Sequence, residues 1–93
     1  SKLGSKKEFY ESLDRALHNY LKSITLFDNS NYSKINIQKE LEKRNIDANI
    51  IKALNQLFSN CEMARYTPIT NVEMESDYKT ALDIIAEIDK SIN

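Results

Sequence analysis

This chain of 93 residues has one glycine, one proline, one cysteine, one histidine and no tryptophan. A β-sandwich or barrel needs many tight turns, which usually use glycine, proline or Asn-Gly pairs, so the shortage of both residues argues against a β fold. A single cysteine cannot form an internal disulfide, and a single histidine cannot build a multi-histidine metal site. We therefore expect no disulfide, no metal and no cofactor, and the lone thiol is typical of a reducing compartment.

The chain also lacks a strong net charge and a long apolar run. Thirteen basic residues face fourteen acidic ones, for a net charge of -1, which removes the usual electrostatic argument for nucleic-acid binding. No apolar run approaches the roughly 18 residues of a membrane span. Residues 1–4 are interpreted as the remnant of a tag or of a membrane-proximal linker. Residues 5–93 are interpreted as a single helical domain, because a chain of this size builds one modest core.

What the chain does have is apolar residues at helical spacing. A first helix is predicted to begin at Ser5, with Glu8 completing a capping box. A short second helix is predicted to begin with Asn36 as its cap and to end near Asn45, because asparagine tolerates the left-handed conformation that closes many helices. The apolar positions of the first helix are Phe9, Leu13, Ala16, Leu17, Tyr20, Leu21 and Ile24, and those of the second are Ile37 and Leu41.

Two further helices are predicted on either side of Pro68. Asp47 caps the third, which must end near Tyr66 because proline disfavours helix at the residue before it. Thr70 and Glu73 form a capping box for the fourth, which is acidic. The third stripe is Ile50, Ile51, Leu54, Leu57, Phe58, Cys61 and Ala64, and the fourth is Met74, Tyr78, Ala81, Leu82, Ile85, Ile88 and Ile92. These stripes predict an all-α fold, a compact bundle of three longer amphipathic helices and one short helix.

Unusual side chains gather where the third predicted helix ends. Glu62 and Arg65 are spaced to pair on one helical face, and Arg65 is also placed to bond the free carbonyl groups of the last turn. Tyr66 is expected to fold its ring over the bundle while its hydroxyl finds a partner. Together with Cys61 and Pro68, these residues form what we call the Cys61–Pro68 corner, which is either structural or a docking surface.

No catalytic pair is apparent. Cys61 lies on an apolar stripe, so we expect it to be buried as a small hydrophobic residue. A nucleophilic cysteine needs a neighbouring base, and the only histidine, His18, is on a different helix, where we expect it at the surface or at the boundary of the core. We therefore do not expect an enzyme, and no catalytic residue is assigned.

Several short motifs along the chain resemble one protein family. They are Ala16-Leu17 and Tyr20-Leu21 in the first helix, then Cys61-Glu62, Ala64-Arg65-Tyr66 and Pro68. With these residues the chain resembles the cytoplasmic C-terminal tail of the BatD family, the Bat aerotolerance or oxygen-tolerance proteins, in which Cys-Glu-x-Ala-Arg-Tyr-x-Pro closes a helix and an acidic amphipathic helix follows. The resemblance covers residues 9–92. It departs from the family at Asn45, where glycine would be expected.

The resemblance implies a cellular context. Such proteins have extracytoplasmic β-rich modules, one membrane helix and this helical tail on the cytoplasmic side of the inner membrane. They are encoded beside von Willebrand A-type Bat proteins and a MoxR-type AAA+ ATPase. The expected function is that of a non-catalytic scaffold that holds protein partners in a stress response. The basic start at Lys2, Lys6 and Lys7 fits a cytoplasmic position near a membrane helix.

An alternative function remains open at this point. Cys61 can instead serve as a thiol-based redox responder under oxygen stress. This role needs an exposed thiol with a low pKa, because the thiolate is the reactive form.

Overall fold

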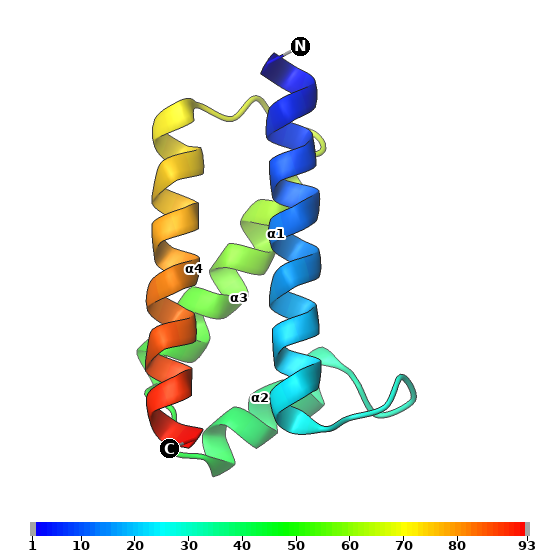
Figure 1. Ribbon diagram of the computed structural model, residues 1–93, viewed down its shortest axis with the longest axis vertical. Coiled ribbons are helices and arrows are strands. Elements are labelled where there is room, and N and C mark those ends of the chain that lie inside the picture. The colour runs from blue at the N-terminus through cyan, green and yellow to red at the C-terminus, as the bar shows by residue number, and fades with distance from the viewer. Residues whose placement is uncertain (1, 93) are drawn as a thin grey trace.

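The computed structural model describes the backbone of residues 2–92 and the side chains of residues 6–92. Over these residues the chain forms α1 (Lys2–Thr25), α2 (Lys34–Lys43), α3 (Ala48–Met63) and α4 (Asn71–Ile92), without a β-strand (Figure 1). The predicted all-α bundle of three longer helices and one short helix is confirmed. Within residues 2–92 no helix is both long and apolar enough to cross a membrane.

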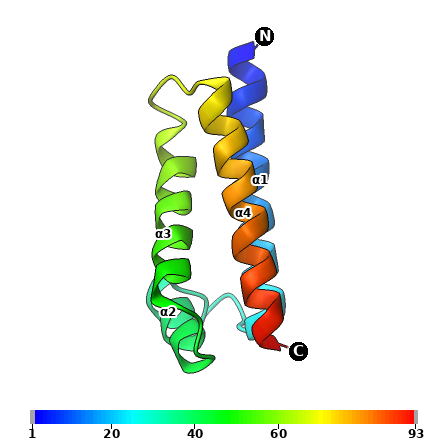
Figure 2. The ribbon, with the colours of Figure 1, turned by 90° about the vertical axis from the view of Figure 1, so that its left-hand side faces the viewer.

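The three long helices form the bundle, and α2 closes one end of it. α1 and α4 lie next to each other and run in the same direction, while α3 runs the opposite way behind them (Figure 1). A quarter turn of the view shows α3 on one side of the α1 and α4 pair, with α2 at the end where α3 begins (Figure 2). Each long helix therefore presents one face to the other two, which is why each carries a single broad apolar stripe.

Two predicted helix starts are wrong. α1 begins at Lys2 rather than Ser5, so Ser5 and Glu8 lie inside the helix and residues 2–4 belong to it. Each added residue contributes one backbone hydrogen bond to an existing helix, so the helix extends past the predicted cap. The cap of α2 is Ser33 rather than Asn36, because Ser33 has extended backbone angles and its Oγ accepts from the Asn36 amide at 3.1 Å.

The remaining predicted caps are confirmed. Asn45 has a φ of 62°, the left-handed conformation expected after α2. The carboxylate of Asp47 caps α3 by accepting a backbone hydrogen bond from the first turn. At the start of α4 the Thr70 amide donates to the Glu73 carboxylate at 2.8 Å, and the Glu73 amide donates to the Thr70 hydroxyl at 3.1 Å. These short polar side chains separate the helices with very little glycine or proline.

The core lies where the three long helices face each other, and α2 contributes to the core at the end of the bundle where α3 begins. Two of its members, Tyr10 and Ile84, are buried although the apolar stripes did not include them. Conversely, Tyr78, Leu82 and Ile92 of the predicted fourth stripe are about half exposed. Residues confirmed as buried include Leu17, Leu21, Ile37, Leu41, Ile51, Leu54, Leu57, Cys61, Ala81 and Ile88.

Candidate functional site

A cleft of about 510 Å³ lies between α1, α3 and the first turns of α2. Its volume falls in the range of ligand-binding clefts, roughly 300 to 1,000 Å³. The floor is apolar and buried, while the rim is polar and charged. The floor includes Tyr10, Leu21, Ile37, Leu41, Leu54 and Cys61, and the rim includes Lys7, Glu11, Asp14, His18, Glu62 and Arg65.

The structure divides the Cys61–Pro68 corner between the cleft and the solvent. Cys61 belongs to the floor, while Glu62 and Arg65 belong to the rim at the end where α3 finishes. Tyr66 and Pro68 are exposed, and Tyr66 keeps 76% of its surface in solvent. The prediction that Tyr66 folds over the bundle is therefore wrong. α3 ends three residues earlier, and the turn after it directs the ring away from the core.

The partners predicted for Arg65 are not found either. Arg65 and Glu62 are both exposed, and within residues 6–92 neither side chain forms an ion pair or a hydrogen bond. Arg65 was expected to bond the free carbonyl groups of the last turn. One of these, the carbonyl oxygen of Met63, already accepts from the amides of Tyr66 at 2.9 Å and Thr67 at 3.0 Å. The turn after α3 thus satisfies this acceptor and leaves the guanidinium group free.

Cys61 is buried, as predicted, with 5% of its surface exposed. Burial raises the pKa of its thiol to about 12, and the negative charges of Asp14 and Asp77 act in the same direction. At neutral pH the sulfur is therefore a thiol, and the reactive thiolate is a very small fraction. This environment is the opposite of the one that a redox-responsive cysteine needs.

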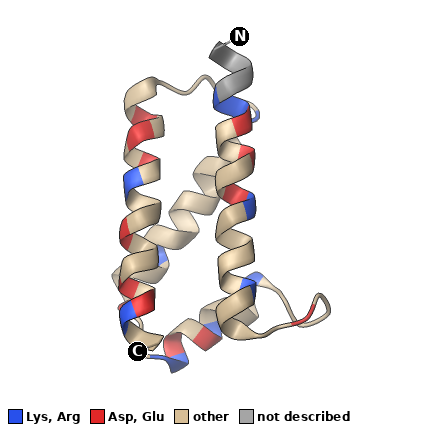
Figure 3. Ribbon diagram, viewed as in Figure 1, with Lys and Arg blue, Asp and Glu red and all other residues tan. Residues whose placement is uncertain are grey.

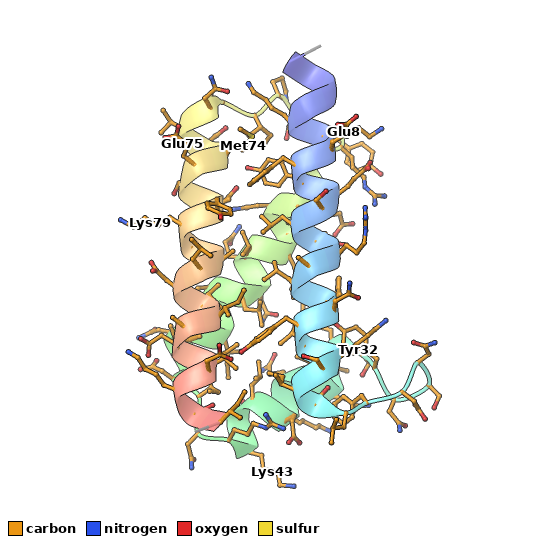
Figure 4. The ribbon with its side chains drawn as sticks, viewed as in Figure 1. Glu8, Tyr32, Lys43, Met74, Glu75 and Lys79 are labelled. Atoms are coloured by element: carbon orange, nitrogen blue, oxygen red, sulfur yellow. The ribbon has the colours of Figure 1, made fainter. Side chains whose placement is uncertain are left out.

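His18 belongs to an aromatic cluster on the cleft rim that the sequence did not indicate. Its ring stacks on Phe58 of α3, with centroids 4.4 Å apart and planes at 22°. Its Nδ1 is hydrogen-bonded to the Tyr32 hydroxyl, and its Nε2 lies 3.6 Å from the Asp14 carboxylate. Tyr32 lies beside α1 near the end of that helix (Figure 4). The cluster places His18 in the same cleft as Cys61, but its two ring nitrogens face Tyr32 and Asp14 rather than the thiol. The stack on Phe58 joins α1 to α3.

A second polar cluster holds the three long helices together near the floor of the cleft. The Tyr10 hydroxyl donates to Asp77 Oδ2 at 2.6 Å, and Asn60 Nδ2 donates to Asp77 Oδ1 at 3.1 Å. Burial and this hydrogen bond raise the pKa of Tyr10 above its usual range. In the sequence Asp77 is one acid among several at the start of α4 (Figure 3). Only the packing of the helices distinguishes it from its neighbours.

The cleft presents a ligand with a protonated thiol, an apolar floor and a charged rim. Among residues 6–92 no group of three or more His, Cys, Asp and Glu side chains is arranged to hold a metal ion. The one thiol is protonated at neutral pH, because its pKa is about 12. What the cleft offers a ligand is an apolar floor for side chains and a charged rim that can orient them.

No protein-family model, no curated protein and no solved structure matches this chain. Its function is therefore inferred from the cleft and the charged rim around it.

Proposed function

We propose that this chain is a non-catalytic protein-interaction domain that holds a segment of a partner in the cleft between α1 and α3. The observation that supports this most strongly is the position of the Cys61–Pro68 corner. Cys61, Glu62 and Arg65 line a cleft of about 510 Å³, and Tyr66 stands exposed beside it. Tyrosine and arginine are the residue types that most often dominate binding energy at protein interfaces.

The resemblance to the BatD tail supplies the cellular context of this proposal. On that reading the domain is the cytoplasmic part of a membrane-anchored protein of aerotolerance or oxidative stress. It acts as a scaffold for the von Willebrand A-type Bat proteins and the MoxR-type AAA+ ATPase. A scaffold of this kind needs a stable fold and an accessible binding surface, and it needs no catalytic group.

The proposal is tested by measuring retention of the A-type Bat proteins and of the ATPase on immobilised domain. We expect Arg65→Ala and Tyr66→Ala each to weaken retention of at least one partner about thirtyfold, as for an interface hot spot. Arg15→Ala is the matched control, because Arg15 is exposed on α1 and does not line the cleft. Equal retention of every partner by the wild type and the two corner variants would exclude the corner as the binding surface.

A further inference from the structure

Four charged side chains on the cleft rim lie close in the sequence to an opposite charge but are not paired with it. Lys7 and Glu11 are four residues apart on α1, a spacing at which opposite charges attract. Glu62 is in the last turn of α3, and Arg65 follows three residues later, after the helix has ended. The ion pairs within residues 6–92 join other groups, Arg44 to Glu40 and Lys90 to Glu87, and the Asp14 carboxylate lies beside His18. These four rim charges are therefore available to a ligand.

The antiparallel course of α1 and α3 gathers the rim charges by sign. Lys7 lies near the start of α1 and Arg65 directly after the end of α3, so both cations belong to the same end of the cleft (Figure 1). The Lys6 ammonium donates to the Ile69 carbonyl at 2.7 Å, which holds the start of α1 against the loop after α3. Glu11 and Glu62 each lie about one turn, roughly 5 Å, further along the cleft.

The floor between these charges is apolar, and an aromatic stack connects α1 to α3 further along the cleft. Tyr10 and Cys61 are buried beneath the charged rim, and the stack of His18 on Phe58 joins α1 to α3 further along. Lys7 and His18 are eleven residues apart, which is about 16 Å along a helix. An extended segment of five or six residues has the same length, at about 3.3 Å per residue.

We propose that this half of the cleft binds a short partner segment that places a carboxylate between Lys7 and Arg65 and an apolar side chain over Tyr10 and Cys61. A basic side chain of the same segment then lies near Glu11 and Glu62. The charges of such a segment complement the order of charges on the rim, and its apolar side chain covers the floor. This inference rests on the proposed function, because it names the chemistry of the segment that the same cleft holds.

The test uses blocked synthetic peptides and the isotopically labelled domain, with binding followed by backbone amide NMR shifts. The probe is Glu-Leu-Lys-Leu-Ser-Ala, in which the Lys follows the Glu by two residues, about 6.6 Å in an extended chain. Its matched control is Gln-Leu-Lys-Leu-Ser-Ala, which has the same shape without the anion. We expect the Glu peptide to bind about fivefold more tightly at low salt, as for an exposed ion pair. The largest shifts are expected at residues 7–11 and 61–65.

Two variants of the domain locate the effect. Arg65→Gln should abolish the preference for the Glu peptide, whereas Arg15→Gln, with the same loss of charge outside the cleft, should preserve it. A third peptide, Ala-Ser-Leu-Lys-Leu-Gln with a blocked N-terminus and a free C-terminal carboxylate, distinguishes the source of the anion, because it has the composition of the Gln control and its Lys lies two residues from the terminus. Preferred binding of this peptide assigns a chain terminus, and preference for the Glu peptide alone assigns a side chain.

Equal affinity for the Glu and Gln peptides, or shifts confined to other parts of the domain, would overturn the carboxylate site. This outcome differs from failure of the proposed function. If full-length partners are retained but the anion has no effect, only the carboxylate site is wrong. If the peptides behave as expected but no Bat protein or ATPase is retained, the site stands and the proposed partners are wrong.

Discussion

Neighbouring residues of the Cys61–Pro68 corner lie in opposite environments. Cys61 is buried and Tyr66 is exposed, although both belong to one short motif. The burial of Cys61 followed from its place on an apolar stripe, because a residue three or four positions from other buried residues shares their face. Tyr66 lies beyond the last helical turn, where the helical period no longer applies. A phenol ring in such a turn is placed by the course of the backbone alone.

At the same scale, Cys61 should resist thiol reagents in the folded domain. A rise of its pKa to about 12 leaves about a thousandfold less thiolate than an ordinary cysteine has at neutral pH. We expect labelling by a disulfide reagent at pH 7.5 to be slow until denaturant unfolds the domain. Labelling of the folded domain at the rate of the unfolded chain would contradict the burial and would restore the thiol-based redox responder.

Among the helices, α4 shows most clearly how a stripe differs from a buried face. Its apolar residues cover a broad arc, and the sequence pattern selected Tyr78, Leu82 and Ile85 as part of the stripe. The structure buries Ala81 and Ile88 of that stripe together with Ile84, which the stripe did not include, and it leaves Leu82 about half exposed. A helix whose apolar arc is wider than the face it buries can pack against its neighbours in more than one rotation about its own axis. The position of α1 and α3, rather than the period, decides which residues are buried.

This difference predicts unequal costs for two nearby substitutions in α4. Ile84→Ala should lower the free energy of unfolding by about 2 to 5 kcal/mol, because it opens a cavity at a buried position. Leu82→Ala should cost about 1 kcal/mol or less, because the side chain is half in solvent. Urea denaturation of both variants checks this expectation. A larger loss for Leu82→Ala would mean that α4 is rotated relative to the described packing.

Across the whole molecule, tyrosine hydroxyls on α1 bond carboxylates on α4. Tyr10 donates to Asp77 and Tyr20 to Asp89, at two levels of the bundle. Both bonds require the two helices to run in the same direction, since both residue numbers rise together. A polar contact of this kind adds a fixed register to an interface that apolar packing alone specifies loosely. Neither bond is visible in the sequence, where the four residues are far apart.

These contacts predict a loss of stability at alkaline pH. Burial, together with bonds to Asp77 and Asp89, raises the pKa of Tyr10 and of Tyr20 above their usual range, and burial raises that of Cys61 to about 12. The unfolded chain releases these protons first, at about pH 9 to 10. The stabilisation is therefore complete below about pH 9 and declines as the pH rises toward the folded-state values, by at most about 1.4 kcal/mol per pH unit for each group.

Urea denaturation of the wild type and of Tyr10→Phe at pH 7.5, 9.5 and 11 tests this prediction. Tyr10→Phe should be less stable at pH 7.5 by about 1 kcal/mol, because Asp77 loses a hydrogen bond. Its stability should also fall less steeply above pH 10, since one titrating group is gone. Identical pH profiles for the two proteins would show that Tyr10 does not link the fold to alkaline pH.

The sequence by itself determined that the chain is all-α, which residue ends α2 and which residues cap α3 and α4. These features depend on interactions within a few positions of one another. Asn45, Asp47 and the pair of Thr70 and Glu73 act on their own turns, so their roles were predictable.

Only the tertiary structure decided which part of each apolar stripe is buried and which carboxylate accepts the hydrogen bond of the Tyr10 hydroxyl. It also decided that the Cys61–Pro68 corner borders a cleft. Each of these depends on the relative positions of helices that are distant in the chain. α1 and α3 run in opposite directions, and this brings Lys7 and Arg65 to one end of the cleft. Local sequence patterns do not predict the relative direction of two helices that are distant in the chain.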